Sequence, residues 1–285
     1  MADNVLEWIR VVGPIVVSWP AIGLIAVLLF RKPLLGVIER FSQSQEGEAE
    51  LGPLKIKLGA PVLPPQYSKA PTEQRSETID LSDTIGRIGD QGPEGTVVGF
   101  TVAYAMQSAI KIGRGEEIVL SPRSIYVAAR KASKLPKDVD TGATLVAALN
   151  AVKKTGAYLE SEWPYSSKTG PAAGTKPAYR ISSYQPLDGI AAILSALRAD
   201  KVVLVGLIVT EDFLSPDASK TGKIVARLPL KVVGGHSVCL VGYDEKEAEF
   251  KFANSWGKQW GKQGFGFIRD SDLSKLLGEA YTVTV

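Results

Sequence analysis

The chain contains one histidine, His236, and the residues around it place it beside an amide side chain. Residues 236–244 (HSVCLVGYD) and 248–254 (AEFKFAN) have the apolar composition of strands, and a short polar stretch that begins at Asp244 separates them. That stretch has the length of a hairpin loop, and pairing outward from it places His236 nearly opposite Asn254. Opposed residues have Cβ atoms about 5 Å apart, and an amide can hold an imidazole in one orientation. The sequence therefore predicts a general base, His236, with Asn254 as the side chain that orients it.

A glycine-rich turn leads into a second element that could take part in chemistry. Residues 90–100 read DQGPEGTVVGF, and the run 97–111 lacks proline and is apolar nearly all round, which predicts a buried helix. The first turn of a helix exposes unpaired backbone N–H groups and the positive end of the helix dipole. The start of this helix is therefore a place where a thiolate or another anion would be stabilised.

Composition excludes several other kinds of site. The only cysteine, Cys239, lies three residues after His236 on one strand, so the two side chains point to opposite faces, and Cys239 is expected to be a buried apolar filler. One cysteine and one histidine form neither an intramolecular disulfide nor a His/Cys zinc cage, and no metal or other cofactor is expected. The formal net charge is +3 without a long Lys/Arg run, so nucleic-acid binding has no support.

Five motifs between about residues 79 and 285 resemble, in order, those of the papain family of cysteine peptidases. They are Asp90-Gln91-Gly92 with Gly95-Thr96 and Phe100; Leu120-Ser121-Pro122 with Tyr126; Trp163-Pro164-Tyr165; Gly235-His236 with Val241-Gly242-Tyr243; and Asn254-Ser255-Trp256-Gly257 with Trp260-Gly261 and Gly264. The resemblance implies an α+β, papain-like fold in which a helical half faces an antiparallel β half. The short, cysteine-poor form looks most like bacterial members.

The resemblance also implies roles for individual residues. Gln91 corresponds to the oxyanion-hole side chain, His236 to the base and Asn254 to its orienter, while Trp256 shields the His–Asn pair. The residues expected to contact a substrate are Gly95, Gly235 and Trp256.

The nucleophile position of this family is occupied by Val97, and the alignment holds on both sides of it. Val98 stands where the family has a tryptophan, Glu94 stands at a half-cystine position, and the Gly-Gly that often lines the cleft is not recognisable. Valine has no heteroatom with which to attack a carbonyl, and loss of a triad nucleophile costs on the order of 10⁶ in turnover. We therefore predict a pseudopeptidase that binds a peptide or protein segment without cutting it.

Two alternatives remain open on the sequence. In the first, the chain is an active peptidase, either through a non-cysteine nucleophile such as Thr96 or because Val97 is an introduced inactivating change. Thr96 is, however, expected to be a helix N-cap that accepts a backbone N–H bond, and Glu94 a solvated loop carboxylate rather than a general acid or base. In the second alternative the chain is a structural subunit of a membrane complex.

The N-terminal residues predict a membrane anchor. Residues 11–30 (VVGPIVVSWPAIGLIAVLLF) carry no charge, and twenty residues at 1.5 Å each match a hydrocarbon core of ~30 Å. Asp3 and Glu7 precede the segment, which disfavours a cleaved signal peptide. The excess of Lys and Arg after the segment predicts that the C-terminal domain is cytoplasmic. The predicted location is therefore a bacterial inner membrane, crossed once.

The predicted organisation has four parts: a tail (1–10), a transmembrane helix (11–30), a juxtamembrane segment and linker (31–78), and a papain-like domain (79–285). A strand-like alternation at Leu54, Ile56 and Leu58 interrupts the linker, and its partner is not evident. In the domain, helices are expected at 97–111, 142–155 and 190–200, and strands at 202–209, 236–244 and 248–254. Helices followed by strands indicate an α+β domain.

Overall fold

A computed structural model of the 285-residue chain describes residues 47–51, 54–58, 78–136 and 139–285, in two units, Met1–Glu73 and Gln74–Val285. In the first unit, β1 (Gly47–Leu51) and β2 (Leu54–Leu58) form an antiparallel pair in which Ala49 lies opposite Ile56. The expected strand at 54–58 is therefore present, and β1 is the partner that the pattern did not reveal. The predicted transmembrane segment 11–30 lies outside the described residues. Among those that are described, no helix combines the length and apolar character needed to cross a membrane.

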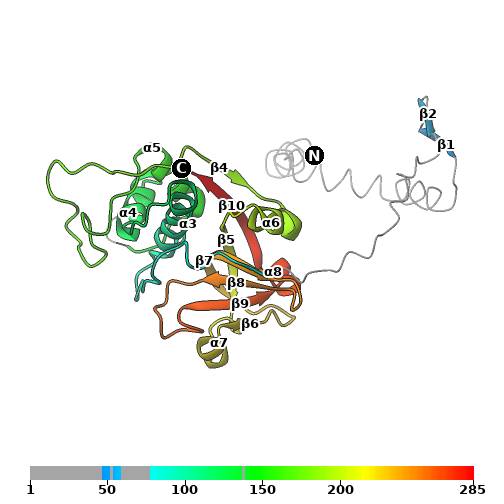
Figure 1. The fold of residues 1–285 in the computed structure, drawn as a ribbon. Helices are drawn as coiled ribbons and strands as arrows, with labels where there is room; N and C mark the ends of the chain where they lie inside the picture. Colours follow the sequence, from blue (N-terminus) through cyan, green and yellow to red (C-terminus); the bar gives the residue numbers. More distant parts are fainter. Residues whose placement is uncertain (1–46, 52–53, 59–77, 137–138) are drawn as a thin grey trace, which may run out of the picture. The chain divides into compact units, whose positions relative to one another are not determined.

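An eight-stranded sheet organises the second unit (Figure 1). Its strands follow the order β4-β10-β5-β7-β8-β9-β6, and β3 also pairs with β7. All pairs are antiparallel except β6 with β9. The strands are β3 (Thr78–Asp80), β4 (Ser183–Pro186), β5 (Val203–Thr210), β6 (Lys223–Ile224), β7 (Val232–Asp244), β8 (Glu249–Ala253), β9 (Phe265–Arg269) and β10 (Leu277–Thr284).

Three helices gather on one side of this sheet in Figure 1, and the longest of them is α3. It is buried on nearly every face, as its uniformly apolar sequence predicts, and it ends at Gly115, which adopts the left-handed conformation that glycine tolerates. The helices are α3 (Val97–Arg114), α4 (Pro122–Ala132), α5 (Leu145–Lys154), α6 (Gly189–Arg198), α7 (Pro216–Thr221) and α8 (Asp270–Leu276). The three predicted helices and three predicted strands are all present, with ends shifted by a few residues.

Strand β7 separates two hydrophobic cores. Cys239 and Val241 belong to the core formed with α3, α4 and α5, whereas Val238 and Leu240 belong to the core of the β half. Because successive strand side chains point to opposite faces, one strand contributes to both cores. This alternation gives the two unlike halves expected from the sequence.

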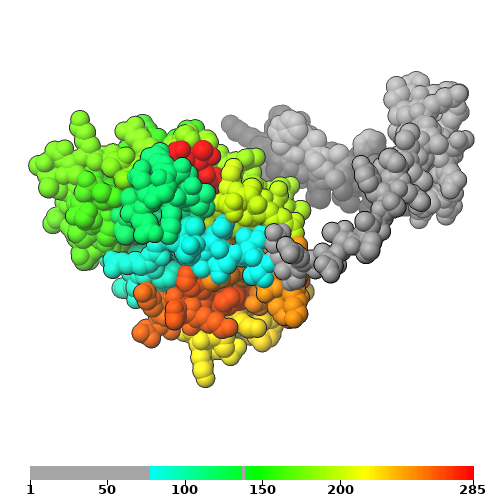
Figure 2. Space-filling model, viewed as in Figure 1, coloured from blue at the N-terminus to red at the C-terminus, as the bar shows by residue number. Residues whose placement is uncertain are grey.

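The segment between β3 and α3 connects the halves. Figure 2 shows it as a cyan band between the green helical half and the orange residues of the β half. Its backbone is bonded to the loop that follows β8: Gln91 donates its N–H to the Ser255 carbonyl at 2.8 Å, and Gly257 donates to the Gly89 carbonyl at 3.0 Å. These bonds hold the start of α3 beside the residues that follow Asn254.

Candidate functional site

The His236 and Asn254 side chains are in contact. Nε2 of His236 lies 2.8 Å from Oδ1 of Asn254, which also accepts the Ser255 N–H at 2.8 Å. A carbonyl oxygen can only accept, so Nε2 carries the hydrogen. Asn254 is fully buried, and its Nδ2 makes no hydrogen bond to any described residue. The two hydrogen bonds to Oδ1 therefore hold the side-chain amide of Asn254 in place.

The strand register differs from the one expected. Cys239 pairs with Ala253, and the register shifts between Leu240 and Gly242, so Val238, not His236, continues the ladder opposite Asn254. A bulge adds one residue to one strand, and no sequence pattern marks this one. His236 thus lies two positions from the residue opposite Asn254, close to the near opposition that the hairpin predicts. The imidazole reaches Asn254 as a diagonal neighbour on the same face.

Aromatic rings surround the imidazole. The centroid of Trp256 lies 4.7 Å from that of His236, and Phe213 meets the imidazole edge-on at 5.8 Å. This burial lowers the pKa of His236 to about 4, and the hydrogen bond to Asn254 opposes the shift only in part. The histidine is therefore neutral at physiological pH and presents Nδ1 as an acceptor.

Val97 is the first residue of α3 and lines the same cleft as His236. The cleft has a volume of about 810 Å³ and also contains Gln91, Gly95 and Gly235. Trp256 does not line it but packs behind His236. The structure thus brings the predicted base, the valine at the nucleophile position and the predicted contact glycines to one opening.

Gln91 is held at both ends of its amide. Its Oε1 accepts the Ser255 hydroxyl at 2.6 Å, and its Nε2 donates to the Glu94 carbonyl at 2.7 Å. An amide nitrogen has two hydrogens, so one N–H remains for a group in the cleft. The geometry fixes this donor next to the start of α3.

Two expectations about the turn before α3 are wrong. Thr96 occupies the N-cap position of α3, but its side chain makes no capping bond and instead lies 2.7 Å from the Tyr165 hydroxyl. The Tyr165 hydroxyl bonds in turn to the Gln91 carbonyl at 2.7 Å, so Thr96 serves a buried network. Glu94 is not a free loop carboxylate, because both of its oxygens bond to the guanidinium of the buried Arg123. This ion pair ties the turn to α4.

Cys239 is fully buried in the core on the α3 side, where burial raises the pKa of its thiol. It faces away from the His236 side of the strand, as expected, and is not a candidate nucleophile. Trp260 is a buried aromatic residue of the β-half core. Within the described ranges, no group of three or more His, Cys, Asp or Glu side chains has the arrangement of a metal site.

A buried hydroxyl pair fastens α3 to β7 directly behind the site. Thr101 Oγ1 lies 3.0 Å from Ser237 Oγ, and both side chains are almost completely buried. Thr101 also bonds to the Val97 carbonyl at 3.1 Å, and Ser237 follows His236 in the chain. The pair therefore couples the position of Val97 to that of His236.

Sequence reasoning missed two walls of the cleft. One is the segment 140–145 before α5, which contacts the turn where the Asp140 carboxylate accepts the Gly95 N–H at 2.7 Å. The other is the pair Gly278 and Glu279 on β10. The Val, Thr and Tyr content of residues 281–285 is typical of a strand and could have identified β10, but nothing in the pattern indicates that it reaches the cleft.

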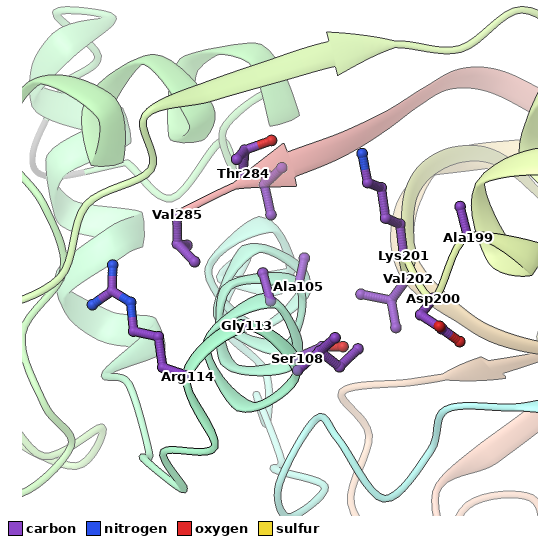
Figure 3. Close-up of a pocket in the computed structure, with 13 residues that line it drawn as sticks. Ala105, Ser108, Gly113, Arg114, Ala199, Asp200, Lys201, Val202, Thr284 and Val285 are labelled. Atoms are coloured by element: carbon purple, nitrogen blue, oxygen red, sulfur yellow. The ribbon is translucent and has the colours of Figure 1, made fainter.

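A separate hollow of about 310 Å³ lies at the other end of α3 (Figure 3). Ala105, Ser108 and Arg114 line it together with Lys201 and Thr284. No predicted site residue contributes to it, so it is not part of the candidate site.

Comparison with known proteins finds a matching family and individual relatives. The profile of the family described as "Papain family cysteine protease" matches residues 75–282. An uncharacterized peptidase C1-like protein of Acanthamoeba polyphaga mimivirus is 29% identical over 220 residues, which cover 69% of this chain and 70% of the viral protein. Pro-cathepsin H of Mus musculus is 25% identical over 194 residues, 65% of this chain and 57% of that protein. The chain thus spans little more than half of the latter relative.

Solved structures share the fold. Xylellain, a cysteine protease from Xylella fastidiosa, superposes with a TM-score of 0.64 at 23% identity, covering 73% of this chain and 85% of xylellain. The bromelain protease from Ananas comosus gives a TM-score of 0.58 at 18% identity, covering 73% and 98%. At such identities the likeness concerns the fold alone, and it supports the expected papain-like α+β architecture.

Proposed function

The chain belongs to the papain family of cysteine proteases, and we propose that it is a member that binds a polypeptide segment in its cleft without hydrolysing it. The observation that carries the proposal is the combination of an assembled His236–Asn254 pair with Val97 at the start of α3. The base and its orienter are in place, but the side chain that would be deprotonated has no acidic hydrogen.

The cleft offers binding groups without a nucleophile. The hydroxyls of Thr96 and Thr101 are engaged with Tyr165 and Ser237, and Cys239 is buried in the core. One Gln91 N–H and the first backbone N–H groups of α3 lie in the cleft lining, where they can donate to a bound peptide carbonyl oxygen. Such donors hold a peptide carbonyl whether or not it is attacked.

We extend the proposal to the location of the protein. The uncharged segment 11–30 has the length of a transmembrane helix, and the excess of Lys and Arg on its C-terminal side favours a cytoplasmic domain. A bacterial inner-membrane protein with a peptide-binding domain in the cytoplasm accounts for these features. Reconstitution into vesicles followed by protease protection of the domain tests the orientation.

The function is tested on the full chain in lipid nanodiscs with fluorescent peptides. The proposal expects saturable binding by fluorescence anisotropy and no peptide-amide hydrolysis above the uncatalysed rate. Hydrolysis that disappears in the His236→Ala variant would show an active enzyme and contradict the proposal.

A steric variant localises the binding. Gly235 lines the cleft, and a Cβ added there would meet only the Leu207 carbonyl oxygen, at 3.9 Å, so Gly235→Phe fits the backbone but narrows the opening. Gly113→Phe is the matched control, because Gly113 lies far along α3 with open space around it. Binding should be lost in the first variant and retained in the second.

A further inference from the structure

A cavity of about 280 Å³ lies beside α3 and is separate from the cleft. We call it the α3 pocket, and the helix lines it with residues spaced as one helical face: Phe100, Ala103, Tyr104 and Gln107. No residue of this lining also lines the cleft. Pockets for drug-sized ligands begin at about 300 Å³, so the α3 pocket has the size for a smaller molecule.

A carboxylate and a guanidinium line the α3 pocket without charged partners among the described residues. Oε1 of Glu160 accepts the Tyr165 N–H at 2.8 Å, whereas Oε2 is buried and makes no hydrogen bond to any described residue. Arg87 is exposed, and none of the ion pairs in the described ranges involves it. The second carboxylate of the lining, Asp90, is exposed and accepts the Gly92 N–H at 2.8 Å within its own turn.

Tyr104 and Gln107 also line the α3 pocket, but their polar atoms already have partners. The Tyr104 hydroxyl accepts the Gly89 N–H at 2.9 Å. Gln107 uses both ends of its amide, because its Oε1 accepts the Leu120 N–H at 2.8 Å and its Nε2 donates to the Ile85 carbonyl. These bonds hold the helical wall of the pocket in one arrangement, as is usual for a preformed ligand site.

The position of Glu160 is unfavourable in the unliganded chain. Burial raises the pKa of its carboxyl, and the Tyr165 N–H and the charges of Arg87 and Arg123 oppose this rise only in part. A buried polar atom without a partner destabilises the fold, and a bound ligand is one way in which such an atom is satisfied. Arg87 acts on Glu160 through its charge but forms no ion pair with it, so a ligand that carries both signs fits between them.

We propose that the α3 pocket binds a free amino acid with an apolar side chain. The ammonium group of the ligand donates to the Glu160 carboxylate, and its carboxylate accepts from the Arg87 guanidinium. Its side chain packs against Phe100, Ala103 and Leu120 in the same lining. A simple amine would leave the guanidinium without a partner, and a simple carboxylic acid would leave the buried carboxylate without one. An amino acid satisfies both, and this site does not depend on peptide binding in the cleft.

The test uses the full chain in nanodiscs and three probes with the same phenyl group. They are L-phenylalanine, phenethylamine, which lacks the carboxylate, and 3-phenylpropionate, which lacks the ammonium group. Isothermal titration calorimetry should show saturable binding of phenylalanine. Each analogue should bind at least about tenfold more weakly, because each loses a hydrogen bond to a charged group. Gly235→Phe narrows the cleft and should leave the affinity for phenylalanine unchanged, since Gly235 does not line the α3 pocket.

Two variants assign the contacts to individual residues. Glu160→Gln should weaken the binding of phenylalanine and phenethylamine at least about tenfold without weakening that of 3-phenylpropionate. The amide oxygen of this variant still accepts the Tyr165 N–H, so the wall of the pocket is preserved. Arg87→Gln should weaken the binding of phenylalanine and 3-phenylpropionate without weakening that of phenethylamine.

Glu117→Gln and Arg114→Gln are the matched controls, because neither residue lines the α3 pocket, and both should leave the three affinities unchanged. Equal affinity for the three probes, or a preference for phenylalanine that persists in both Glu160→Gln and Arg87→Gln, would overturn the inference. The absence of saturable binding at millimolar phenylalanine would overturn it as well. Fluorescent peptides report on the cleft separately, so either result leaves the proposed peptide-binding function to its own test.

Discussion

His236 donates from Nε2 to Oδ1 of Asn254 over 2.8 Å, and this bond leaves Nδ1 as the unprotonated ring nitrogen. Asn254 cannot reverse the arrangement, because its Oδ1 also accepts the Ser255 N–H. The site therefore retains an oriented base although Val97 offers it no proton.

The first prediction concerns the Val97→Cys variant. A thiol there lies at the first turn of α3, where the helix dipole and the nearby imidazole favour the thiolate. We expect measurable hydrolysis of peptide amides by this variant, at least about 10²-fold above the original chain, since the remaining triad members are in place. Val97→Ala is the control and should stay inactive, and adding His236→Ala to Val97→Cys should remove the gain. A silent Val97→Cys variant that still binds peptide would mean that the donors or the base are misplaced.

The second prediction concerns the single histidine. Because the chain has no other, one imidazole signal in an NMR titration reports the pKa of His236, which should be about 4. A midpoint near 6.5 would contradict the described burial.

The same shift predicts a pH dependence of stability. The unfolded chain takes up the proton near pH 6.5 and the folded chain only near pH 4, so the unfolded state binds more protons between these values. The free energy of unfolding should therefore fall as pH falls from 6.5 to 4, by on the order of 2 kcal/mol from this residue. His236→Gln should lack that component in urea unfolding curves measured at a series of pH values.

A double-mutant cycle tests the hydroxyl pair behind the site. Thr101→Val should lower the free energy of unfolding by about 1–2 kcal/mol, because it leaves the buried Ser237 hydroxyl without its partner. Ser237→Ala should cost about 1 kcal/mol, because the Thr101 hydroxyl keeps its bond to the Val97 carbonyl. The double variant should lose about 1 kcal/mol less than the sum of the single losses. Strict additivity in urea unfolding would show that the two hydroxyls do not interact.

The ion pair between Glu94 and Arg123 should contribute more than a surface pair. The Arg123 side chain is 9% exposed and also lies over the Tyr165 ring at 4.6 Å, so Arg123→Met should cost about 2 kcal/mol. Arg227→Met is the comparison, since Arg227 is 70% exposed and pairs with Asp212, and it should cost no more than about 0.5 kcal/mol. Thermal unfolding of both variants at one pH measures the difference, and equal costs would argue against a structural role for the pair.

Two glycines of α3 should respond to alanine in opposite directions. A Cβ at Gly99 would lie 2.2 Å from the Pro122 carbonyl oxygen, so Gly99→Ala forces α3 and α4 apart and should cost about 3 kcal/mol. Gly113 has open space around it, and Gly113→Ala should raise stability by about 0.5–1 kcal/mol through higher helix propensity. Denaturant unfolding of the two variants provides the comparison, and a neutral Gly99→Ala would contradict the described helix contact.

The sequence was sufficient for the parts of the fold that local patterns encode. The apolar run of α3 predicted a buried helix, and the alternation along β7 predicted that Cys239 and His236 face opposite sides. The contact between His236 and Asn254 was also predicted, because a hairpin loop limits how far two strands can slip.

Features that depend on tertiary contacts were not predicted. The bulge between Leu240 and Gly242 lies where β3 pairs with β7. A Cβ at Gly242 would lie 2.4 Å from the Ile79 carbonyl oxygen, so the backbones of β3 and β7 approach closely there. The residues near Gly242 in the sequence do not indicate this contact. Thr96 does not form the expected N-cap hydrogen bond, because its hydroxyl bonds instead to the hydroxyl of Tyr165, 69 residues away. Glu279 was missed for the same reason, because it reaches the cleft only through the register of β10 against β5.

The sharing of β7 between two cores has a consequence for how the domain opens. Cys239 and Val241 are buried in one core, and Val238 and Leu240 are buried in the other. Strand β5 (Val203–Thr210) also pairs with β7 along most of its length. Because β7 packs into both cores, we expect neither half to unfold while β7 keeps its contacts with the other half. The backbone amide protons of β7 should then exchange with solvent only when the whole domain unfolds. Since His236 and Ser237 belong to this strand, the base would be held by the slowest-exchanging unit of the protein, and partial unfolding at the domain edges would leave it undisturbed.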